Sequence, residues 1–318
     1  MSLPETLQGL VIRAQSGFLT VETIAGQFIC RLRGRLKQGV AESDIIAVGD
    51  RVTITPEVDG TGTIEAILPR SAAFSRIRTG IKRDYRQIIL ANPDQIVAVF
   101  ACAQPEPHLR MLDRFLVIAE KQGIMALIVA NKIDLVRPSQ AKALFGLYEE
   151  LGYPVLYTSA HTGEGLDALR GRLKDKISAL AGPSGVGKSS LLNAIQPDLG
   201  LHVRAVSDAT SKGIHTTQVR ELFPLDVGGY VADTPGIRSL ALWDTEPEEL
   251  DAYFVEMRMR VADCQLSDCT HTHEPGCAIR AAVEAGEIWP ERYHSYLRLR
   301  FGDEADMYVG DELKDEAD

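Results

Sequence analysis

Hydrophobic residues recur along this chain with two different spacings, and each spacing predicts a different kind of domain. Between residues 10 and 68 they alternate with polar residues in short runs rich in β-branched and aromatic side chains. Turns containing Gly, Asp or Pro separate these runs, which lie at 10–13, 18–22, 28–32, 51–55 and 63–68. Such a series of short strands without an intervening helix predicts a small barrel of the OB type over residues 1–69.

From residue 94 onward, strand patterns and helix patterns follow one another in turn. Buried strands are predicted at 95–101, 124–130, 155–158 and 177–181, with further strands near 220–225 and 230–232. Helices are predicted at 110–121, 139–151, 166–176 and 190–195. This alternation predicts an α/β domain over residues 94–245, with a mostly parallel sheet and helices on both faces. A basic linker at 70–93 precedes it. A helical module at 246–302 follows, with helices expected at 246–262 and 278–285.

Charge is unevenly distributed, and this changes what the net charge of −10 implies. Residues 303–318 hold one lysine and eight acidic residues, so we expect a solvated, disordered acidic tail there. Residues 1–90 hold 12 basic and 9 acidic residues, and Arg31, Arg33 and Arg35 would share one face of a strand. We therefore expect the barrel to bind RNA. The alternative is a solvated edge strand whose charges protect it from pairing.

No stretch of the chain reaches the ~18 apolar residues that a membrane span needs, and the N-terminal residues lack the pattern of a signal peptide. We expect a cytoplasmic monomer that does not associate with membranes. Cys30 and Cys102 lie in apolar runs and are expected in the core. The three other cysteines cluster near the C-terminus, where metal ligation is a better explanation than disulfides in a reducing compartment.

One segment matches the phosphate-binding loop G-x-x-x-x-G-K-S, between a predicted strand and a predicted helix. Its residues are Gly182, Pro183, Ser184, Gly185, Val186, Gly187, Lys188, Ser189 and Ser190. The glycines allow backbone N–H groups to surround an anion, and the helix adds its positive N-terminal end. We expect the catalytically important Lys188 to reach the β- and γ-phosphates, and Ser189 to ligate Mg²⁺. An ordinary Gly-rich turn is the alternative.

A second motif indicates which nucleotide binds. The motif N-K-x-D, at the end of a predicted strand, consists of Asn131, Lys132, Ile133 and Asp134. Its carboxylate can accept hydrogen bonds from N1–H and the N2 amino group of guanine, whereas adenine offers neither donor in that arrangement. An unpaired buried carboxylate is costly, so such a site can reject the wrong base by about 10⁴-fold. Ser159 and Ala160, after another predicted strand, suit a contact with the guanine carbonyl.

The remaining nucleotide contacts are expected in two further loops. Asp233, in the sequence D-T-P-G, can hold Mg²⁺, and the Gly236 N–H can contact the γ-phosphate. Either Thr216 or Thr217, in the sequence G-I-H-T-T, can complete the Mg²⁺ shell. These motifs come after N-K-x-D and S-A, whereas an ordinary GTPase has them first. The order indicates a circularly permuted GTPase domain, whose sheet is unchanged because strand positions do not depend on where the chain is cut.

The C-terminal cluster contains four candidate metal ligands, Cys264, Cys269, His271 and Cys277. Three thiolates and one imidazole suit tetrahedral Zn²⁺, and a complete set of protein ligands suits a structural site. Unrelated buried thiols are the alternative. His273 is a rival imidazole that we expect to face solvent. Trp289, Tyr293 and Tyr296 are expected to pack this module.

These motifs resemble those of the RsgA/YjeQ family, circularly permuted GTPases of bacterial small-subunit ribosome assembly. The resemblance is carried by A-N-P-D-Q at 91–95, N-K-I-D at 131–134, G-P-S-G-V-G-K-S-S at 182–190, G-I-H-T-T at 213–217 and D-T-P-G at 233–236. It extends over about residues 10–300, without the acidic tail. It implies one structural Zn²⁺ at the four C-terminal positions and Mg²⁺ with GTP.

The resemblance also implies a function, which is late assembly of the 30S subunit. Contact with 16S rRNA and hydrolysis of GTP to GDP, stimulated by the particle, are expected. Ile237 follows D-x-x-G and cannot orient water, so His215 is expected to do so; capping of its own loop is the alternative. A nucleotide-gated RNA-binding module remains a second possible function, and a phosphate-loop kinase is a third, which N-K-x-D disfavours. We also expect the nucleotide state to act on the metal module, because that module directly follows D-T-P-G.

Overall fold

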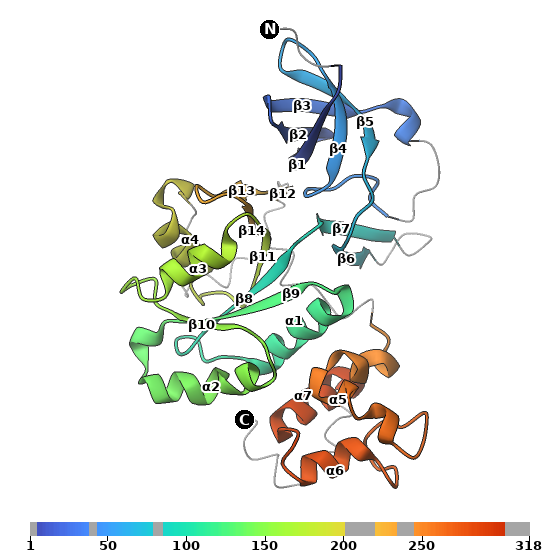
Figure 1. The fold of residues 1–318 in the computed structure, drawn as a ribbon, viewed down its shortest axis with the longest axis vertical. Coiled ribbons are helices and arrows are strands. Elements are labelled where there is room, and N and C mark those ends of the chain that lie inside the picture. The colour runs from blue at the N-terminus through green and yellow to red at the C-terminus, as the bar shows by residue number, and fades with distance from the viewer. Residues whose placement is uncertain (1–4, 38–42, 79–84, 201–219, 234–244, 303–318) are drawn as a thin grey trace.

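The computed structural model describes residues 5–37, 43–78, 85–200, 220–233 and 245–302. The first five strands close into a barrel, as predicted (Figure 1). They are β1 (Leu7–Gln15), β2 (Phe18–Thr23), β3 (Gly26–Leu32), β4 (Arg51–Pro56) and β5 (Thr61–Ile67). Their order is β1-β2-β3-β5-β4, and pairing of β4 with β1 closes the barrel. Alternate residues such as Val11, Val21 and Cys30 are fully buried inside it, because successive side chains of a strand point to opposite faces.

The three arginines that were predicted to share one face of a strand do not do so. β3 ends at Leu32, and η1 (Gly34–Lys37) is a 3₁₀ turn. The Arg31 guanidinium lies 4.5 Å from the centre of the Phe18 ring. Arg33 and Arg35 instead both contact the side chain of Glu65. The strand needed for the alternation stops before Arg33, so this part of the prediction is wrong.

The segment 70–93, predicted as a basic linker, contains a hairpin of two antiparallel strands, β6 (Ala73–Arg78) and β7 (Tyr85–Ala91). Phe74 and Leu90 face each other in this hairpin and are almost completely buried. They belong to the same apolar core as Ile12 of the barrel and Ile96 of the next domain. The expectation of a plain linker is therefore corrected. Its frequent arginines hide the few apolar positions that pack.

A second sheet of six strands follows, in the order β10-β9-β8-β11-β14-β13. Its strands are β8 (Gln95–Ala101), β9 (Met125–Asn131), β10 (Val155–Thr158), β11 (Ile177–Ala181), β13 (Phe223–Pro224) and β14 (Tyr230–Asp233). All pairings are parallel except that of β13 with β14. β9 leads into N-K-x-D and β11 into the phosphate loop, so both loops lie at the carboxyl edge of one sheet, where ligands of such folds bind.

Helices cover both faces of this sheet, as predicted. They are α1 (Leu109–Gln122), α2 (Pro138–Glu150), α3 (Leu166–Leu173) and α4 (Lys188–Ile195), with short 3₁₀ turns η2 (Ile133–Leu135) and η3 (Pro197–Leu199). Ile96 and Phe100 of β8 pack with α1 and α2. Val97 and Val99, which point to the other face, pack with α3 and α4. None of the helices in the described residues is long and apolar enough to cross a bilayer.

The strand predicted near 220–225 is two short strands that belong to different sheets. β12 (Arg220–Glu221) pairs antiparallel with β1 and therefore extends the sheet of the barrel. β13, which begins two residues after β12 ends, pairs with β14 in the α/β sheet. Leu222 lies between them and is almost completely buried. This segment therefore ties the barrel to the α/β domain.

The C-terminal module lies beside α1 (Figure 1). Its elements are η6 (Pro247–Tyr253), α5 (Val255–Arg258), η7 (Val261–Asp263), α6 (Ala278–Glu284) and α7 (Pro290–Phe301). The single helix predicted at 246–262 is wrong, because Phe254 has an extended backbone (φ −90°, ψ 107°) that breaks it into short turns. α6 agrees with the prediction, whereas α7 was not predicted. Tyr293 and Tyr296 are buried as expected, but Trp289 is 44% exposed.

Candidate nucleotide and metal sites

The phosphate loop connects β11 to α4 and passes very close to neighbouring backbone. Gly182 has φ +139°, and a Cβ there would lie 2.1 Å from the carbonyl oxygen of Val99. Gly187 has φ +96°, and a Cβ there would lie 2.5 Å from Nδ2 of Asn131. Both positions require glycine, because a side chain would clash and L-residues rarely adopt these angles. The sequence motif therefore corresponds to a real steric constraint at each of these two glycines.

Lys188 and Ser189 begin α4 at the end of this loop. The Lys188 ammonium donates hydrogen bonds to the carbonyl oxygens of Gly182 (2.9 Å) and Pro183 (2.7 Å). Its charge is thus held directly beside the loop, next to the positive N-terminal end of a helix. This arrangement concentrates positive potential where phosphates are expected to bind.

Asn131 connects the two nucleotide motifs. It is 1% exposed at the end of β9, and its Nδ2 donates to the carbonyl oxygen of Val186 in the phosphate loop (2.8 Å). Its Oδ1 accepts from the Thr158 hydroxyl (3.2 Å). Both ends of its side-chain amide are therefore held by protein groups, one of them in the phosphate loop. Two loops that are 55 residues apart in the chain meet at this side chain.

Asp134, the expected reader of guanine, is exposed and held by Ser159. The Ser159 hydroxyl donates to Oδ1 of Asp134 (2.5 Å) and accepts from the backbone N–H groups of His161 (3.2 Å) and Thr162 (3.1 Å). These bonds fix the carboxylate at the carboxyl edge of the sheet. The sequence predicted a base contact for Ser159 but gave no sign of this orienting role, because the two residues are 25 positions apart.

Lys132 adopts a left-handed backbone conformation (φ +62°), and its ammonium contacts the carbonyl oxygen of Gln104. Burial lowers the pKa of Lys132, while the nearby Asp134 carboxylate opposes this shift. The Lys132 side chain therefore lies beside Asp134 at this edge of the sheet, and its contact with a base stays a prediction. Gln104 was not among the predicted site residues.

Several predicted site residues lie outside the part of the chain that the structure describes. They are His215, Thr216, Thr217, Gly236 and Ile237, together with the side chain of Asp233. The backbone of Asp233 is described, and it lies opposite Leu180 in the parallel pairing of β14 with β11. This register places Asp233 at the same edge of the sheet as the phosphate loop. The roles assigned to these residues stay predictions.

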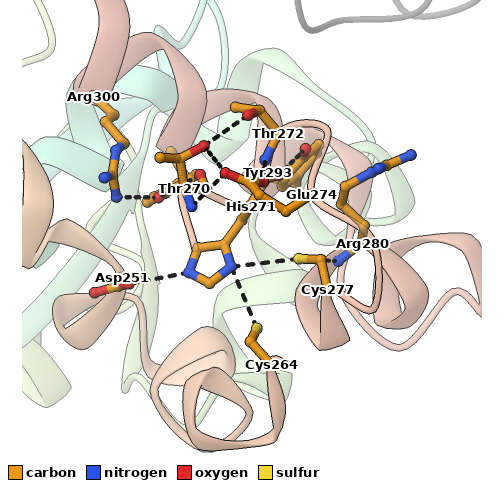
Figure 2. A network of polar contacts seen from close by, with 11 residues as sticks. Asp251, Cys264, Thr270, His271, Thr272, Glu274, Cys277, Arg280, Tyr293 and Arg300 are labelled. Atoms are coloured by element: carbon orange, nitrogen blue, oxygen red, sulfur yellow. Dashed lines mark hydrogen bonds and ion pairs between the residues drawn. The ribbon is translucent and has the colours of Figure 1, made fainter. Parts of the chain in front are cut away.

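The four C-terminal ligand candidates converge, and Figure 2 shows three of them, Cys264, His271 and Cys277. One donor atom from each of Cys264, Cys269, His271 and Cys277 lies within 4.8 Å of all the others. His271 Nδ1 is 3.6 Å from Sγ of Cys264 and 3.4 Å from Sγ of Cys277. A sulfur atom and an imidazole nitrogen bound to one tetrahedral Zn²⁺ are about 3.5 Å apart, given a Zn–S distance of about 2.3 Å and a Zn–N distance of about 2.0 Å. The donor atoms thus fit a single four-coordinate metal ion.

The imidazole is oriented for metal binding through Nδ1. Its other nitrogen, Nε2, is 3.0 Å from Oδ2 of Asp251, and the ring is fully buried. A carboxylate that binds the distal nitrogen fixes the tautomer and the ring orientation of a metal-ligating histidine. The backbone is held as well, because the Tyr293 hydroxyl donates to the His271 carbonyl (2.5 Å). His273, the rival imidazole, is exposed. Asp251 was not foreseen from the sequence.

Glu274 ties down the loop that carries His271. Its carboxylate accepts hydrogen bonds from the backbone N–H groups of Thr270 (2.8 Å), Thr272 (2.9 Å) and His273 (3.2 Å), as Figure 2 shows in part. Burial alone would raise the pKa of Glu274, but the hydrogen bonds from Thr270 and Thr272 outweigh it and lower the pKa to about 2. The loop is therefore organised around an anion before any metal is considered.

Comparison with known proteins decides the family. Residues 67–243 match the RsgA GTPase family model, and residues 8–64 match the RsgA N-terminal domain. The chain is 50% identical over 295 residues to the small ribosomal subunit biogenesis GTPase RsgA of Gemmatimonas aurantiaca, covering 92% of this chain and 96% of that protein. It is 45% identical to the protein of the same name from Moorella thermoacetica, covering 92% and 95%. The chain belongs to the RsgA GTPase family.

Solved structures of similar proteins agree with the RsgA fold. YjeQ from Thermotoga maritima is 40% identical, with a TM-score of 0.76 over 93% of this chain and 98% of that one. YloQ, described as a circularly permuted GTPase, is 34% identical, with a TM-score of 0.71 over 93% and 94%. The resemblance drawn from the motifs is confirmed, as are the permuted α/β fold, the N-terminal barrel and the assignment as a GTP hydrolase.

Proposed function

We propose that this GTPase acts on the small ribosomal subunit, assists its late assembly, and hydrolyses GTP faster when bound to that particle. The names of its relatives motivate the choice of particle. The observation that carries the nucleotide half of the proposal is the contact between Asn131 and Val186, which brings the base-reading loop against the phosphate loop. In this proposal the protein works as a monomer in the cytoplasm, the compartment in which bacterial ribosomes are assembled.

Catalysis in this proposal relies on positioning and charge, as in other phosphoryl transfers. Lys188 holds the β- and γ-phosphates, and Asp134 holds the guanine edge so that the γ-phosphate lies in a fixed place. Mg²⁺, when bound through Ser189, Asp233 and either Thr216 or Thr217, would neutralise phosphate charge. His215 orients the attacking water, since Ile237 cannot. A ribosomal particle that orders the surrounding loops can raise turnover by about 10³–10⁵-fold.

The barrel supplies the contact with 16S rRNA in this proposal. Phe18 is 43% exposed, and the Arg31 guanidinium lies 4.5 Å from its ring centre on the neighbouring strand. An exposed aromatic ring beside a cation suits stacking on an unpaired base, which is worth about 1–3 kcal/mol per base. The C-terminal cluster holds one structural Zn²⁺, because three sulfur atoms and one imidazole nitrogen are the ligands that zinc prefers in closed sites.

The nucleotide half of the proposal is tested by changing which base the site accepts. Asp134→Asn replaces an acceptor with an amide that can donate, so affinity for GTP should fall by about 100-fold or more, while XTP, whose base carries a carbonyl at the N2 position of guanine, should gain. Asp167→Asn, at an exposed position on α3, is the matched control. Calorimetry with GTP, XTP and ATP measures the change. Unchanged base preference in Asp134→Asn would refute the site.

The ribosomal half is tested by GTP turnover with and without purified small subunits. The native chain should be slow alone and should accelerate at least 10²-fold on the particle. The same assay with large subunits is the control for nonspecific charge. Equal acceleration of GTP turnover by both particles, or no acceleration by either, would contradict the proposed partner. RNA affinity that is unaffected in Lys188→Ala and in every nucleotide state would favour a nucleotide-independent RNA-binding module instead.

A further inference from the structure

In the chain, β12 lies between the two motifs G-I-H-T-T and D-T-P-G, and it pairs with a strand of the barrel. It begins three residues after Thr217, and β14 ends at Asp233 of D-T-P-G. Its partner is β1, with Arg13 opposite Glu221 and Ala14 opposite Arg220. The segment between two expected nucleotide contacts is thus hydrogen-bonded to the barrel, which binds RNA in the proposed function. Both the nucleotide and the RNA can therefore act on β12.

The pairing of β12 with β1 is made by backbone, side chain and core contacts. The Leu222 N–H donates to the carbonyl oxygen of Ile12 (2.8 Å). Nη1 of Arg13 is 3.7 Å from Oε1 of Glu221. Leu222 is 1% exposed and belongs to the same apolar core as Ile12 and Ile177. Leu222 therefore fixes the end of β12 to the barrel and to the apolar core that the barrel shares with the α/β domain.

A second contact joins the barrel to β14. The Tyr230 hydroxyl of β14 contacts the Glu22 carboxylate of β2. Burial raises the pKa of Tyr230 to about 12, and its contact with Glu22 acts in the same direction. The barrel therefore grips both ends of the segment 220–233. A shift of this segment at its nucleotide-facing ends has to be taken up at β1 and β2.

We propose that the pairing of β12 with β1 is the element through which the bound nucleotide sets the affinity of the barrel for RNA, with the backbone N–H of Leu222 holding that pairing in place. This inference rests on the proposed function. Coupling of this kind is reciprocal: if GTP strengthens RNA binding through β12, then RNA strengthens GTP binding by the same factor. The β12 pairing is only two residues long, so a small change in its register or hydrogen bonding is a large fraction of the whole contact.

The quantity to measure is the affinity for small ribosomal subunits with a non-hydrolysable GTP analogue, divided by the affinity with GDP. Leu222→Pro removes the N–H that bonds Ile12, whereas Leu222→Ala removes at least as much side-chain packing and keeps the N–H. We expect Leu222→Ala to keep the native ratio and Leu222→Pro to bring it close to one, with GTP affinity in the absence of subunits unchanged in both. A merely structural role would lower the affinities in both nucleotide states equally and leave the ratio intact.

A charge exchange repeats the test without disturbing the core and decides the matter if Leu222→Pro does not fold. Arg13→Glu faces Glu221 with a like charge, so the ratio should fall roughly 2–5-fold, in keeping with cross-strand charge pairs of up to about 1 kcal/mol. The double variant Arg13→Glu with Glu221→Arg should restore it. A folded Leu222→Pro with the native ratio, or Arg13→Glu without effect, overturns the inference. If the native protein binds subunits with a ratio of one, the inference also fails; if it does not bind them, the proposed function fails.

Discussion

The α/β domain is joined to its two neighbours by two different kinds of contact. At the barrel, the junction combines short backbone pairing, shared apolar packing, the contact of Tyr230 with Glu22 and a solvent-accessible ion pair. At the metal module, the junction also has apolar packing, through Val117 of α1, and exposed ion pairs, but at its centre is a buried cation, Arg292, which is 1% exposed. Its guanidinium lies 2.6 Å from Oδ1 of Asp113 on α1 and 2.7 Å from Oε1 of Glu256 on α5. A small displacement is expected to weaken the first junction gradually, whereas at the second it would leave buried charges without partners.

The difference lies in what a small displacement costs. Burial alone would lower the pKa of Arg292, but the carboxylates of Asp113 and Glu256 raise it well above its ordinary value. The Tyr148 hydroxyl also donates to Asp113 (2.8 Å). Separating these groups by a few ångströms leaves charges buried without partners, which is strongly unfavourable. The metal module is therefore expected to move with α1 as one body, whereas the barrel can adjust.

The largest effect should come from removing a metal ligand. Cys269→Ser deletes one of the four donors, and metal binding at structural zinc sites supplies on the order of 10 kcal/mol to folding. We expect the variant to lose its metal and residues 245–302 to become sensitive to protease, while GTP still binds to the α/β domain. Metal analysis and limited proteolysis measure this. His273→Gln is the matched control, since this imidazole is exposed, and loss of metal there would contradict the ligand assignment.

Breaking the buried ion cluster should rank second. Arg292→Met leaves Asp113 and Glu256 buried without their cation, which should cost about 3–5 kcal/mol of unfolding free energy. Arg258→Met is the matched control: it also removes a cation facing α1, bonded to Glu120 at 3.1 Å, but its side chain is 51% exposed. The control should cost no more than about 1 kcal/mol. Equal losses in urea denaturation of the two variants would erase the distinction between the junctions.

The sequence could predict motifs formed by neighbouring residues but not the contacts between distant residues that form these junctions. Motifs formed by neighbouring residues were found: the glycines of the phosphate loop, N-K-x-D, and a Cys/His cluster whose members lie within 14 positions of one another. Their chemistry is local, so the pattern in the sequence is complete. The strands and helices of the α/β sheet were found for the same reason, because each carries its own periodicity.

Contacts between distant residues left no such pattern. Arg292 and Asp113 are 179 positions apart, and within α7 the arginine resembles one more solvated charge in a polar helix. Asp251, the partner of His271, precedes that histidine by 20 positions. The hairpin β6–β7 was missed because its buried Phe74 and Leu90 are stabilised by the barrel and the α/β domain rather than by their own segment. Tertiary packing decided each of these cases.

A third prediction concerns the anion that organises the metal loop. The pKa of Glu274 is about 2 in the folded protein and about 4.3 in an unfolded chain. A depressed pKa means that the carboxylate stabilises the fold above about pH 4.3, and that this contribution is lost as the pH falls toward 2. Glu274→Gln should therefore cost roughly 1–3 kcal/mol at pH 7, and the difference from the native protein should shrink on acidification.

The measurement is urea denaturation of both proteins from pH 7 downward. Both keep the same four metal ligands, so acid release of the metal affects them alike and largely cancels in the difference. A difference that is constant with pH would mean that Glu274 acts through packing alone. That result would mean that the Glu274 charge does not stabilise the metal loop, unlike the buried charges at the junction with α1.

The smallest effect should come from the exposed ion pair at the barrel junction. Arg13 and Glu221 are 43% and 34% exposed, so water and salt screen their attraction. Arg13→Ala should lower the unfolding free energy by less than about 1 kcal/mol, and the loss should shrink further in 1 M salt. Arg292→Met, by contrast, should lose almost the same amount at both salt concentrations, because its partners are buried. A salt-insensitive loss in Arg13→Ala would show that the barrel, too, is held by a desolvated charge, and that its junction is as rigid as the one at the metal module.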